Sequence, residues 1–219
     1  RLLWREGAEA LCVILAAYLL FGSHYLNRQL TAFVGAEVRE LRESKEATFL
    51  VLEYQDATEG KYQQLLVNSK SYANNRLEGR RYMAALAHYP VLFHKNPSQA
   101  VVICIGTGTT IGAITSYDEL QSIQAVDLAK DVFDFAPYFA PVNKQFHENA
   151  RVQIIVADGR HYLLSTEDTF DVVTLEPPPP LDAGVVNLYS EEFYKLVKQR
   201  MRPGAVLAQW VPLDMERGI

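Results

Sequence analysis

The stretch from Ala100 to Asp127 constrains the fold of this chain more than any other part of the sequence. An apolar run meets the glycine loop Gly106-Thr107-Gly108, which opens into a short helical segment, and a second apolar run ends on Asp127. A buried strand, a tight turn, a helix N-terminus and an acid at the tip of the next strand form half of a nucleotide site. We therefore expect Gly106, Thr107 and Gly108 to approach a ligand through their backbone. Asp127 is expected to accept hydrogen bonds from a ribose diol.

The spacing of the glycines separates two kinds of cofactor. A dinucleotide site needs the pattern G-x-G-x-x-G, which would place a glycine at position 111, but that residue is Ile111. The third glycine is Gly112, one position later. The looser pattern suits a nucleoside without a pyrophosphate, such as S-adenosylmethionine. Taken alone, the loop is also compatible with an ordinary tight turn between a strand and a helix.

Composition and charge exclude several classes of protein. The chain has 219 residues, 49% of them hydrophobic and 21% charged, which fits one large domain or a domain with an appendage. Its net charge of −5 argues against binding to nucleic acid through phosphate contacts and would attract a small cation. The two cysteines, Cys12 and Cys104, lie far apart, so the sequence predicts neither a disulfide framework nor a metal site.

The first third of the chain predicts helices followed by a small β-element. Leu11 to Phe21 is an apolar run of eleven residues, short of the roughly 20 that cross a bilayer. It is either a buried or interfacial helix or the end of a membrane segment. Leu26 to Leu41 has apolar residues at helical spacing and predicts an amphipathic helix. Thr48 to Tyr54 and Tyr62 to Val67 predict a β-hairpin, and Arg76 to His88 predicts a helix that ends at Tyr89-Pro90.

The rest of the chain alternates strands with helices, which predicts a doubly wound, mostly parallel α/β sheet. The best-defined helix runs from Ser190, the expected N-cap, to Arg202, and Pro203-Gly204 is expected to end it. We expect three parts: helices over residues 1–46, the β-element over 47–75 and the nucleoside-binding domain over 76–219. Because the chain stops just after a strand, we also expect that domain to be truncated. The predicted strands are Ala100 to Ile105, Ser122 to Val126, Val152 to Val156, Phe170 to Leu175 and Ala205 to Val211, and the other predicted helical pieces are Thr109 to Tyr117, Lys130 to Tyr138 and a short turn after Gly159.

Polar residues stand at the carboxyl ends of these strands, where ligands bind in such folds. Asp127 ends the second strand, and Asp158-Gly159 follows the third, where a carboxylate can accept from an adenine amino group. Glu176 ends the fourth and is followed by four prolines, and Gln209 lies within the fifth. Acids often cap the helix that follows a strand, but several around one glycine loop favour a nucleoside site. The prolines fix the loop backbone, and Glu176 suits a cation or an amine nucleophile.

Taken together, these motifs resemble the polyamine aminopropyltransferases, the spermidine synthase family, and in particular bacterial members fused behind membrane helices. The resemblance implies a small N-terminal β-domain before a Rossmann-like domain. It also implies transfer of an aminopropyl group from decarboxylated S-adenosylmethionine to an amine, with no tightly bound cofactor. The motifs that carry it are Val101 to Gly112, Asp127, Val156 to Arg160, Phe170 to Pro177, Asn187 to Tyr194 and Leu207 to Gln209.

The resemblance also assigns roles to single residues. Asp127 would hold the ribose and Asp158 the adenine, beside Gly159. Glu176 falls where the family has its catalytic aspartate and would act as the base. Tyr189 and Gln209 would line the amine pocket, and Glu78 matches an upstream acid that contributes to substrate binding.

The chain departs from the family pattern at three places. The family loop reads Gly-Gly-Gly-Asp-Gly-Gly, and its aspartate contacts the aminopropyl ammonium, whereas this chain has Thr109 there. A second acid after the catalytic one is replaced by Pro178 or Pro179. The segment Tyr82-Met83-Ala84 lacks the His/Gln-Glu pair that follows this tyrosine. Nucleoside binding survives these changes, but specificity for polyamines does not follow from them.

Three functions therefore remain open. The first is an aminopropyltransferase-like enzyme with a small amine as its partner. The second is a methyltransferase that uses intact S-adenosylmethionine, and the third is a non-catalytic domain of a membrane protein that senses a nucleoside or polyamine. A location at the cytoplasmic face, with a tether through the N-terminal segment, is expected for the membrane-fused type, and a homodimer is left open.

Overall fold

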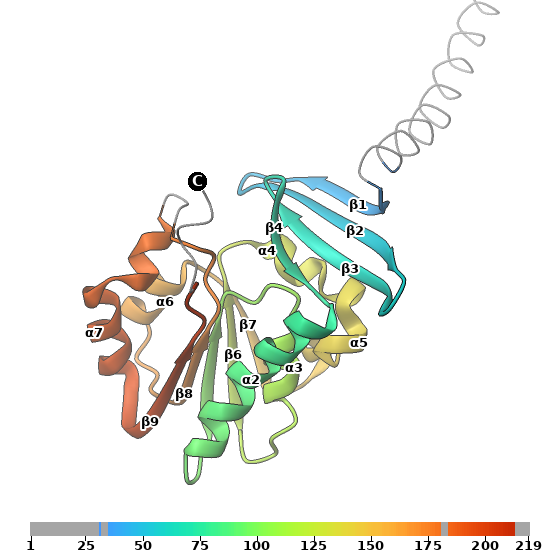
Figure 1. Ribbon diagram of the computed structural model, residues 1–219. Helices are drawn as coiled ribbons and strands as arrows, with labels where there is room; N and C mark the ends of the chain where they lie inside the picture. Colours follow the sequence, from blue (N-terminus) through green and yellow to red (C-terminus); the bar gives the residue numbers. More distant parts are fainter. Residues whose placement is uncertain (1–30, 32–34, 181–183, 213–219) are drawn as a thin grey trace, which may run out of the picture.

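The computed structural model describes residues 31, 35–180 and 184–212 (Figure 1). The apolar run Leu11 to Phe21 lies outside these residues, as does most of the helix predicted over Leu26 to Leu41. Within the described ranges, no helix is long and apolar enough to cross a membrane. The described chain forms a four-stranded antiparallel sheet followed by a five-stranded parallel sheet with helices on its two faces (Figure 1).

The antiparallel sheet contains the predicted hairpin and two further strands. Its order is β1 (Glu37–Glu43), β2 (Thr48–Asp56), β3 (Gly60–Val67) and β4 (Lys70–Asn74). The helix predicted to reach Leu41 is wrong over β1, because the sequence Glu-Val-Arg-Glu-Leu-Arg-Glu alternates between half-buried and exposed side chains and pairs with β2. The first strand lies ahead of residue 47, at which the β-element is expected to begin. The three-part division of the chain stays a prediction.

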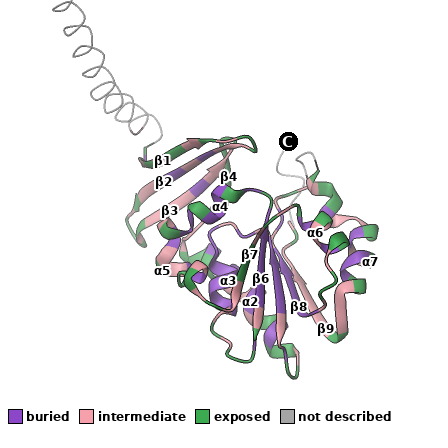
Figure 2. Cartoon of the chain, turned by 180° about the vertical axis from the view of Figure 1, so that it is seen from behind, coloured by how far each residue is buried: buried purple, intermediate pink, exposed green. Residues whose placement is uncertain are grey.

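The parallel sheet confirms the predicted fold class, a Rossmann-like α/β fold. Its strand order is β7-β6-β5-β8-β9, with every neighbouring pair parallel. The interior strands β5, β6 and β8 are the most deeply buried, and β7 and β9 form the edges (Figure 2). The bounds are β5 (Gln99–Ile103), β6 (Ser122–Asp127), β7 (Val152–Val156), β8 (Phe170–Leu175) and β9 (Met201–Gln209).

Helices cover both faces of this sheet and bury two separate apolar clusters. On one face, Ala100 and Val102 of β5 pack with α2, α3 and residues of the antiparallel sheet. On the other, Val101 and Ile103 pack with α6 and α7. The helical elements are α2 (Leu77–Phe93), α3 (Thr109–Ile114), α4 (Lys130–Asp134), η1 (Ala136–Phe139), α5 (Ala140–Asn143), η2 (Phe146–Glu148), α6 (Gly159–Ser165), η3 (Val185–Tyr189) and α7 (Glu191–Arg200).

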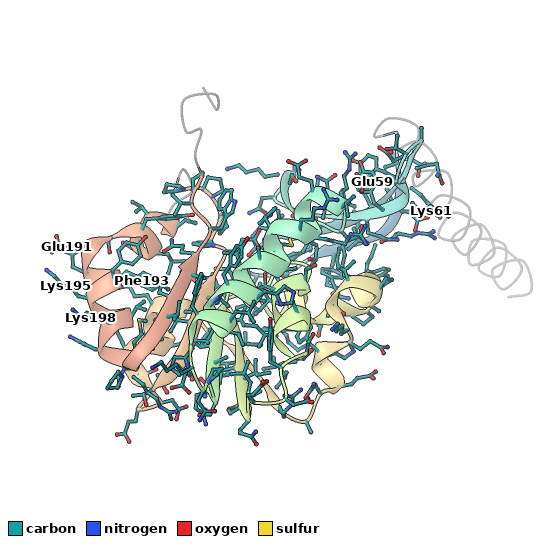
Figure 3. All side chains as sticks on the ribbon, turned by 60° about the horizontal axis from the view of Figure 1, so that its bottom comes forward. Glu59, Lys61, Glu191, Phe193, Lys195 and Lys198 are labelled. Carbon is teal, nitrogen blue, oxygen red and sulfur yellow. The ribbon has the colours of Figure 1, made fainter. Side chains whose placement is uncertain are left out.

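Helix α7 has the N-cap expected from the sequence but ends earlier than expected. The Ser190 side chain accepts a hydrogen bond from the Phe193 backbone N–H, as predicted. Phe193 is fully buried, while Glu191 and Lys195 form an exposed ion pair (Figure 3). The helix stops at Arg200, and Pro203-Gly204 lies in β9, where the pairing with β8 is irregular.

Helix α2 continues past the proline that was expected to end it. Pro90 lies inside the helix, which runs on to Phe93. A proline lacks the N–H that would bond to the carbonyl four residues earlier, so the Leu86 carbonyl loses its helical partner. That carbonyl accepts a hydrogen bond from the Thr174 hydroxyl of β8 at 3.0 Å. The sheet thus supplies the missing donor and allows the helix to persist.

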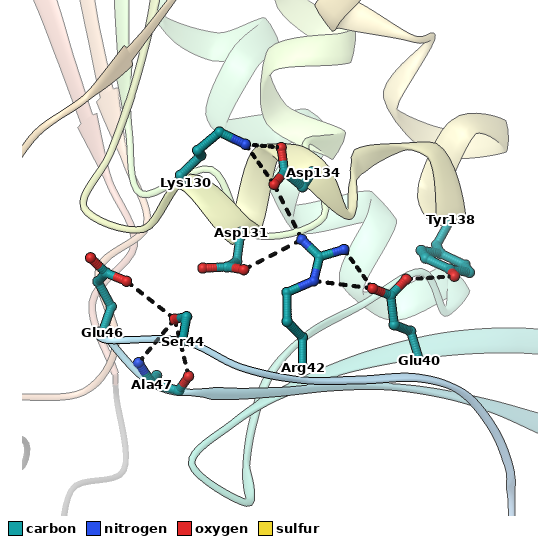
Figure 4. Close-up of polar contacts among 9 residues, drawn as sticks. All are labelled: Glu40, Arg42, Ser44, Glu46, Ala47, Lys130, Asp131, Asp134 and Tyr138. Carbon is teal, nitrogen blue, oxygen red and sulfur yellow. Dashed lines mark hydrogen bonds and ion pairs between the residues drawn. The ribbon is translucent and has the colours of Figure 1, made fainter. Parts of the chain in front are cut away.

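A polar network joins the antiparallel sheet to the parallel domain. The Arg42 guanidinium of β1 contacts Asp131 and Asp134 of α4 (Figure 4). It also lies 4.4 Å from the centre of the Phe135 ring. On the same strand, Glu40 accepts a hydrogen bond of 2.7 Å from the Tyr138 hydroxyl. These contacts fix the antiparallel sheet against the segment that follows β6.

Candidate functional site

The predicted site residues gather at the carboxyl end of the parallel sheet. The glycine loop follows β5, Asp127 ends β6, Asp158 follows β7 and Glu176 follows β8. The end of β4 lies against the loop, since a Cβ placed on Gly106 would come within 3.2 Å of the Ala73 side chain. The end of the antiparallel sheet therefore lies beside the glycine loop at the carboxyl end of the parallel sheet.

The glycine loop requires its two glycines. Gly106 and Gly108 have φ angles of 56° and 80°, the left-handed region that side chains disfavour. A Cβ on Gly108 would also lie 2.5 Å from the Phe146 ring. Between and after them, the Thr107 and Thr109 hydroxyls lie 2.8 Å apart and are buried. The position that holds an aspartate in the family thus holds a buried threonine with a partner inside the protein.

Asp127 braces the glycine loop from the neighbouring strand. Its Oδ2 accepts from the Ile105 N–H at 2.8 Å, and its Oδ1 accepts from the Ala129 N–H at 3.1 Å. Burial raises the pKa of Asp127 to about 6, although these backbone donors act in the opposite direction. A carboxylate has about four lone-pair sites, so two bonds leave it able to accept from a ribose as well.

Asp158 and Gly159 begin α6. Asp158 is exposed, and its Oδ1 accepts from the His161 N–H at 2.8 Å as the N-cap of the helix. A Cβ on Gly159 would lie 2.4 Å from Cγ2 of Ile103, so the glycine allows α6 to pack on β5. Both residues lie at the carboxyl end of the sheet, as predicted. Asp158 also caps α6, and Gly159 also allows α6 to pack on β5.

Glu176 has the most unusual electrostatic setting of the predicted residues. It is half-buried, and one carboxylate oxygen accepts a hydrogen bond of 2.5 Å from the Tyr82 hydroxyl of α2. Burial raises the pKa of Glu176 to about 7, although the bond from Tyr82 lowers it. Glu78 lies one helical turn before Tyr82, is exposed, and contributes to the raised pKa of that phenol after burial and Glu176.

Tyr189 and Gln209 lie beside the proline loop. The Tyr189 hydroxyl is 3.0 Å from the carbonyls of Pro177 and of Pro178, to which it can donate. The Gln209 amide donates to the Leu188 carbonyl at 3.3 Å. Its Oε1 is buried and has no hydrogen-bond partner among the described residues. This oxygen is therefore an acceptor that remains available.

Three further side chains that interact with Glu176 or Asp127 were not assigned a role from the sequence. Tyr82 bonds to Glu176, and the Tyr72 phenol and the Cys104 thiol are close enough to Glu176 and Asp127 for these charges to raise their pKa values, after the larger effect of burial. Tyr82 carried a sequence signal, because it follows Glu78 by one helical turn. Tyr72 and Cys104 carried none, since their positions depend on how β4 and the end of β5 pack. Among the described residues, no group of three or more His, Cys, Asp and Glu side chains could hold a metal ion.

These features define a Rossmann-like α/β protein with a candidate site at the carboxyl end of its parallel sheet. A small antiparallel sheet lies beside this site. The model of the Spermine/spermidine synthase domain matches residues 79–210, more than half of the chain. The chain therefore belongs to the spermine/spermidine synthase family.

Curated relatives agree with this assignment. The polyamine aminopropyltransferase of Nitrosomonas europaea is 28% identical over 128 residues, which cover 58% of this chain and 39% of that protein. The corresponding protein of Aeropyrum pernix is 30% identical over 128 residues, covering 57% and 41%. The chain thus spans about two fifths of the length of these relatives.

Solved structures show the same fold. A spermidine synthase in complex with the transition-state analogue AdoDATO superimposes with a TM-score of 0.69 at 21% identity, covering 78% of this chain and 57% of that one. The spermidine synthase from Thermotoga maritima gives a TM-score of 0.65 at 20% identity, covering 78% and 55%.

Proposed function

We propose that this chain is the nucleoside-binding and catalytic part of an aminopropyltransferase, in which decarboxylated S-adenosylmethionine donates to a small amine. The observation that carries the proposal is the half-buried Glu176 carboxylate, bonded to Tyr82 at the carboxyl end of β8, with a pKa of about 7. The family and its named aminopropyltransferases support this chemistry over the alternatives.

The chemistry explains why an acid with such a pKa is useful. An alkyl amine with a pKa like that of lysine is neutral in only about one molecule in 2,500 at pH 7, which withholds about 4.6 kcal/mol from nucleophilic attack. Glu176 would orient the amine and accept its proton. The amine nitrogen forms a bond to the carbon beside the sulfonium, the carbon–sulfur bond breaks, and its electron pair remains on the sulfur of methylthioadenosine. Because sulfonium is a good leaving group, positioning supplies much of the remaining acceleration.

The other predicted site residues form two groups, one proposed for each substrate. We propose that Asp127, the glycine loop and Asp158 with Gly159 hold the nucleoside of the donor. Tyr189, Gln209 and Glu78 would line the amine side, and the unpartnered Oε1 of Gln209 supports a hydrogen bond to an amine N–H. Tyr82 would fix the direction of the Glu176 carboxylate.

The direct test is the substitution Glu176→Gln. The amide keeps the size of the side chain but cannot accept the proton, so release of methylthioadenosine should fall by about 10²–10⁴-fold. Calorimetric affinity for methylthioadenosine should persist. Glu191→Gln, which removes an exposed carboxyl from α7, is the matched control and should change neither quantity. Unchanged turnover in Glu176→Gln would show that another group is the base.

Parallel titrations identify the donor. Decarboxylated S-adenosylmethionine, intact S-adenosylmethionine and methylthioadenosine are compared by calorimetry on the wild-type chain. Preference for the decarboxylated compound supports aminopropyl transfer. Preference for intact S-adenosylmethionine would replace it with methyl transfer, and the absence of any binding would remove the enzymatic proposal.

A further inference from the structure

Two buried threonine hydroxyls, from two different elements, hold the middle of helix α2. Thr110 of α3 donates to the Met83 carbonyl at 3.1 Å, and Thr174 of β8 donates to the Leu86 carbonyl at 3.0 Å. Residues three apart are neighbours on one face of a helix. The two bonds therefore fix one turn of α2 against both α3 and β8.

This turn of α2 connects the two halves of the candidate site. Tyr82 directly precedes Met83, and its hydroxyl donates to Glu176 at 2.5 Å. Glu176 comes two residues after Thr174 at the end of β8. On the other side, α3 opens directly from the glycine loop. The loop proposed to hold the donor and the proposed base thus meet at the same turn of α2.

The bond from Thr110 is not needed to satisfy the helix backbone. Met83 lies inside α2, where the N–H of Ala87 is the regular partner of its carbonyl. The Thr110 hydroxyl is a second donor to that oxygen, so its removal leaves no carbonyl of α2 without a partner. The Thr107 hydroxyl adds a further contact between the loop and α2, at 3.6 Å from Sδ of Met83.

We propose that Thr110 is a positioning residue, which sets α2 so that Tyr82 directs the Glu176 carboxylate toward the attacking amine. The inference rests on the proposed function, because it presupposes Glu176 as the base and a donor at the glycine loop. Thr110 acts only through α2 and Tyr82, and it contacts no reacting atom.

The experiment removes the hydroxyl with Thr110→Val, which keeps nearly the same shape. Release of methylthioadenosine from decarboxylated S-adenosylmethionine is measured with saturating putrescine, a small diamine, as the acceptor. We expect kcat to fall by about tenfold, because a small displacement of a reacting group is costly. Calorimetric affinity for methylthioadenosine should change by less than about twofold, since the interaction lost is one made in the transition state. The loop also keeps its bonds from the Ile105 N–H to Asp127 and from the Asn143 amide to the Thr107 carbonyl.

The pH dependence of kcat distinguishes positioning from a general loss of stability. The bond from Tyr82 lowers the pKa of Glu176 below the value that burial alone would give. If α2 shifts and this bond weakens, the pKa rises and the base is protonated over a wider range. The acidic limb of the kcat profile should therefore move to higher pH in Thr110→Val, by about half a unit or more.

Two further variants complete the test. Thr110→Ser loses a methyl group but keeps the hydroxyl, so kcat and the acidic limb should return close to the wild-type values. Thr115→Val is the matched control, because the Thr115 hydroxyl donates to the Gly112 carbonyl within the same segment, at 2.7 Å. It should change neither quantity.

The outcomes separate this inference from the proposed function. An unchanged kcat and acidic limb in Thr110→Val, or a loss that Thr110→Ser does not restore, would overturn the role of Thr110 while Glu176 remains the base. If the wild-type chain releases no methylthioadenosine, or if Glu176→Gln does not slow the release, the proposed function or its base fails and the inference fails with it.

Discussion

Glu176 and Asp127 are the two acids whose surroundings oppose their ionisation most clearly. Burial raises their pKa values to about 7 and about 6, respectively. Backbone N–H donors offset part of the cost of burying the Asp127 carboxylate, whereas the Glu176 carboxylate accepts a hydrogen bond only from the Tyr82 hydroxyl among the described residues. This difference suits their proposed roles. Asp127 is held in a fixed position by backbone donors, whereas Glu176 is proposed to exchange a proton near neutral pH.

The raised pKa of Glu176 predicts a pH dependence of stability. A carboxyl with a higher pKa in the folded state binds its proton more tightly there than in the unfolded chain. The stabilisation is therefore complete below the ordinary value of 4.5 and is lost as the pH rises through about 7. Between pH 5 and pH 8, the free energy of unfolding of the wild type should fall relative to that of Glu176→Gln by about 2 kcal/mol.

Urea unfolding at several pH values measures this difference. Asp127 titrates in both proteins and therefore cancels from the comparison. Glu191→Gln, which removes an exposed carboxyl, should follow the wild-type curve. Parallel curves for the wild type and Glu176→Gln would contradict the raised pKa.

At the scale of elements, the sequence predicts the parallel sheet better than it predicts the ends of helices. The strands at Val152–Val156 and Phe170–Leu175 have the expected bounds, because apolar runs between turn residues indicate buried strands. The helical spacing of Leu26 to Leu41 predicts a helix, but pairing with β2 decides the conformation of Glu37–Glu43. Local sequence cannot show that Thr174 will satisfy the carbonyl freed by Pro90.

The candidate site, too, could be predicted from the sequence only in part. The acids at the ends of strands could be predicted, since the alternation of strands and helices brings them to one edge. The partners that set their pKa values could not be, because Tyr82 meets Glu176 only when α2 packs beside β8. Tyr72 depends in turn on how one sheet lies over another.

Gly112 shows that the third glycine of the loop pattern serves packing. A Cβ at this position would lie 2.4 Å from the backbone oxygen of Asn143, which cannot move without shifting α5. We expect Gly112→Ala to destabilise the chain by about 1–3 kcal/mol, despite the better helix propensity of alanine. The free energy of unfolding in urea measures this effect.

Gly79→Ala is the matched control for this prediction. It adds the same methyl group to a glycine in a helix, where the nearest atoms are Oδ1 of Asn74 at 3.1 Å and the Asn74 backbone oxygen at 3.3 Å. These distances are at least 0.7 Å longer than the 2.4 Å at Gly112, so a smaller shift suffices and the cost should be clearly smaller. Equal stabilities of the two variants would contradict the packing role of Gly112.

At the scale of the whole molecule, Arg42 joins the antiparallel sheet to helix α4 of the parallel domain. Its guanidinium bonds to Asp131 and Asp134 and lies over the Phe135 ring. Arg42→Ala should lower the free energy of unfolding by about 1 kcal/mol or more, through loss of the cation–π contact and of the partly buried ion pairs.

Arg39→Ala provides the control for Arg42. Arg39 lies on the same strand but pairs with Glu37 and Glu53 within its own sheet. We expect Arg39→Ala to lower the free energy of unfolding by less than Arg42→Ala does. Arg39→Ala should also leave the rate of proteolysis between the antiparallel sheet and the parallel domain unchanged. If Arg39→Ala and Arg42→Ala behave alike, the contact between the antiparallel sheet and α4 does not depend on Arg42.

The direct passage from β4 into α2 has a consequence for how such proteins can change. Lys70–Asn74 and Leu77–Phe93 are separated by only Asn75 and Arg76, so Ala73 and Tyr82 belong to one short uninterrupted segment. Ala73 of this segment lies against the glycine loop, which is proposed to hold the donor, and Tyr82 bonds to Glu176, which is proposed to act on the amine. Recombination that exchanges residues 70–93 between relatives would transfer both preferences together, so the two substrates are expected to diverge as a linked pair.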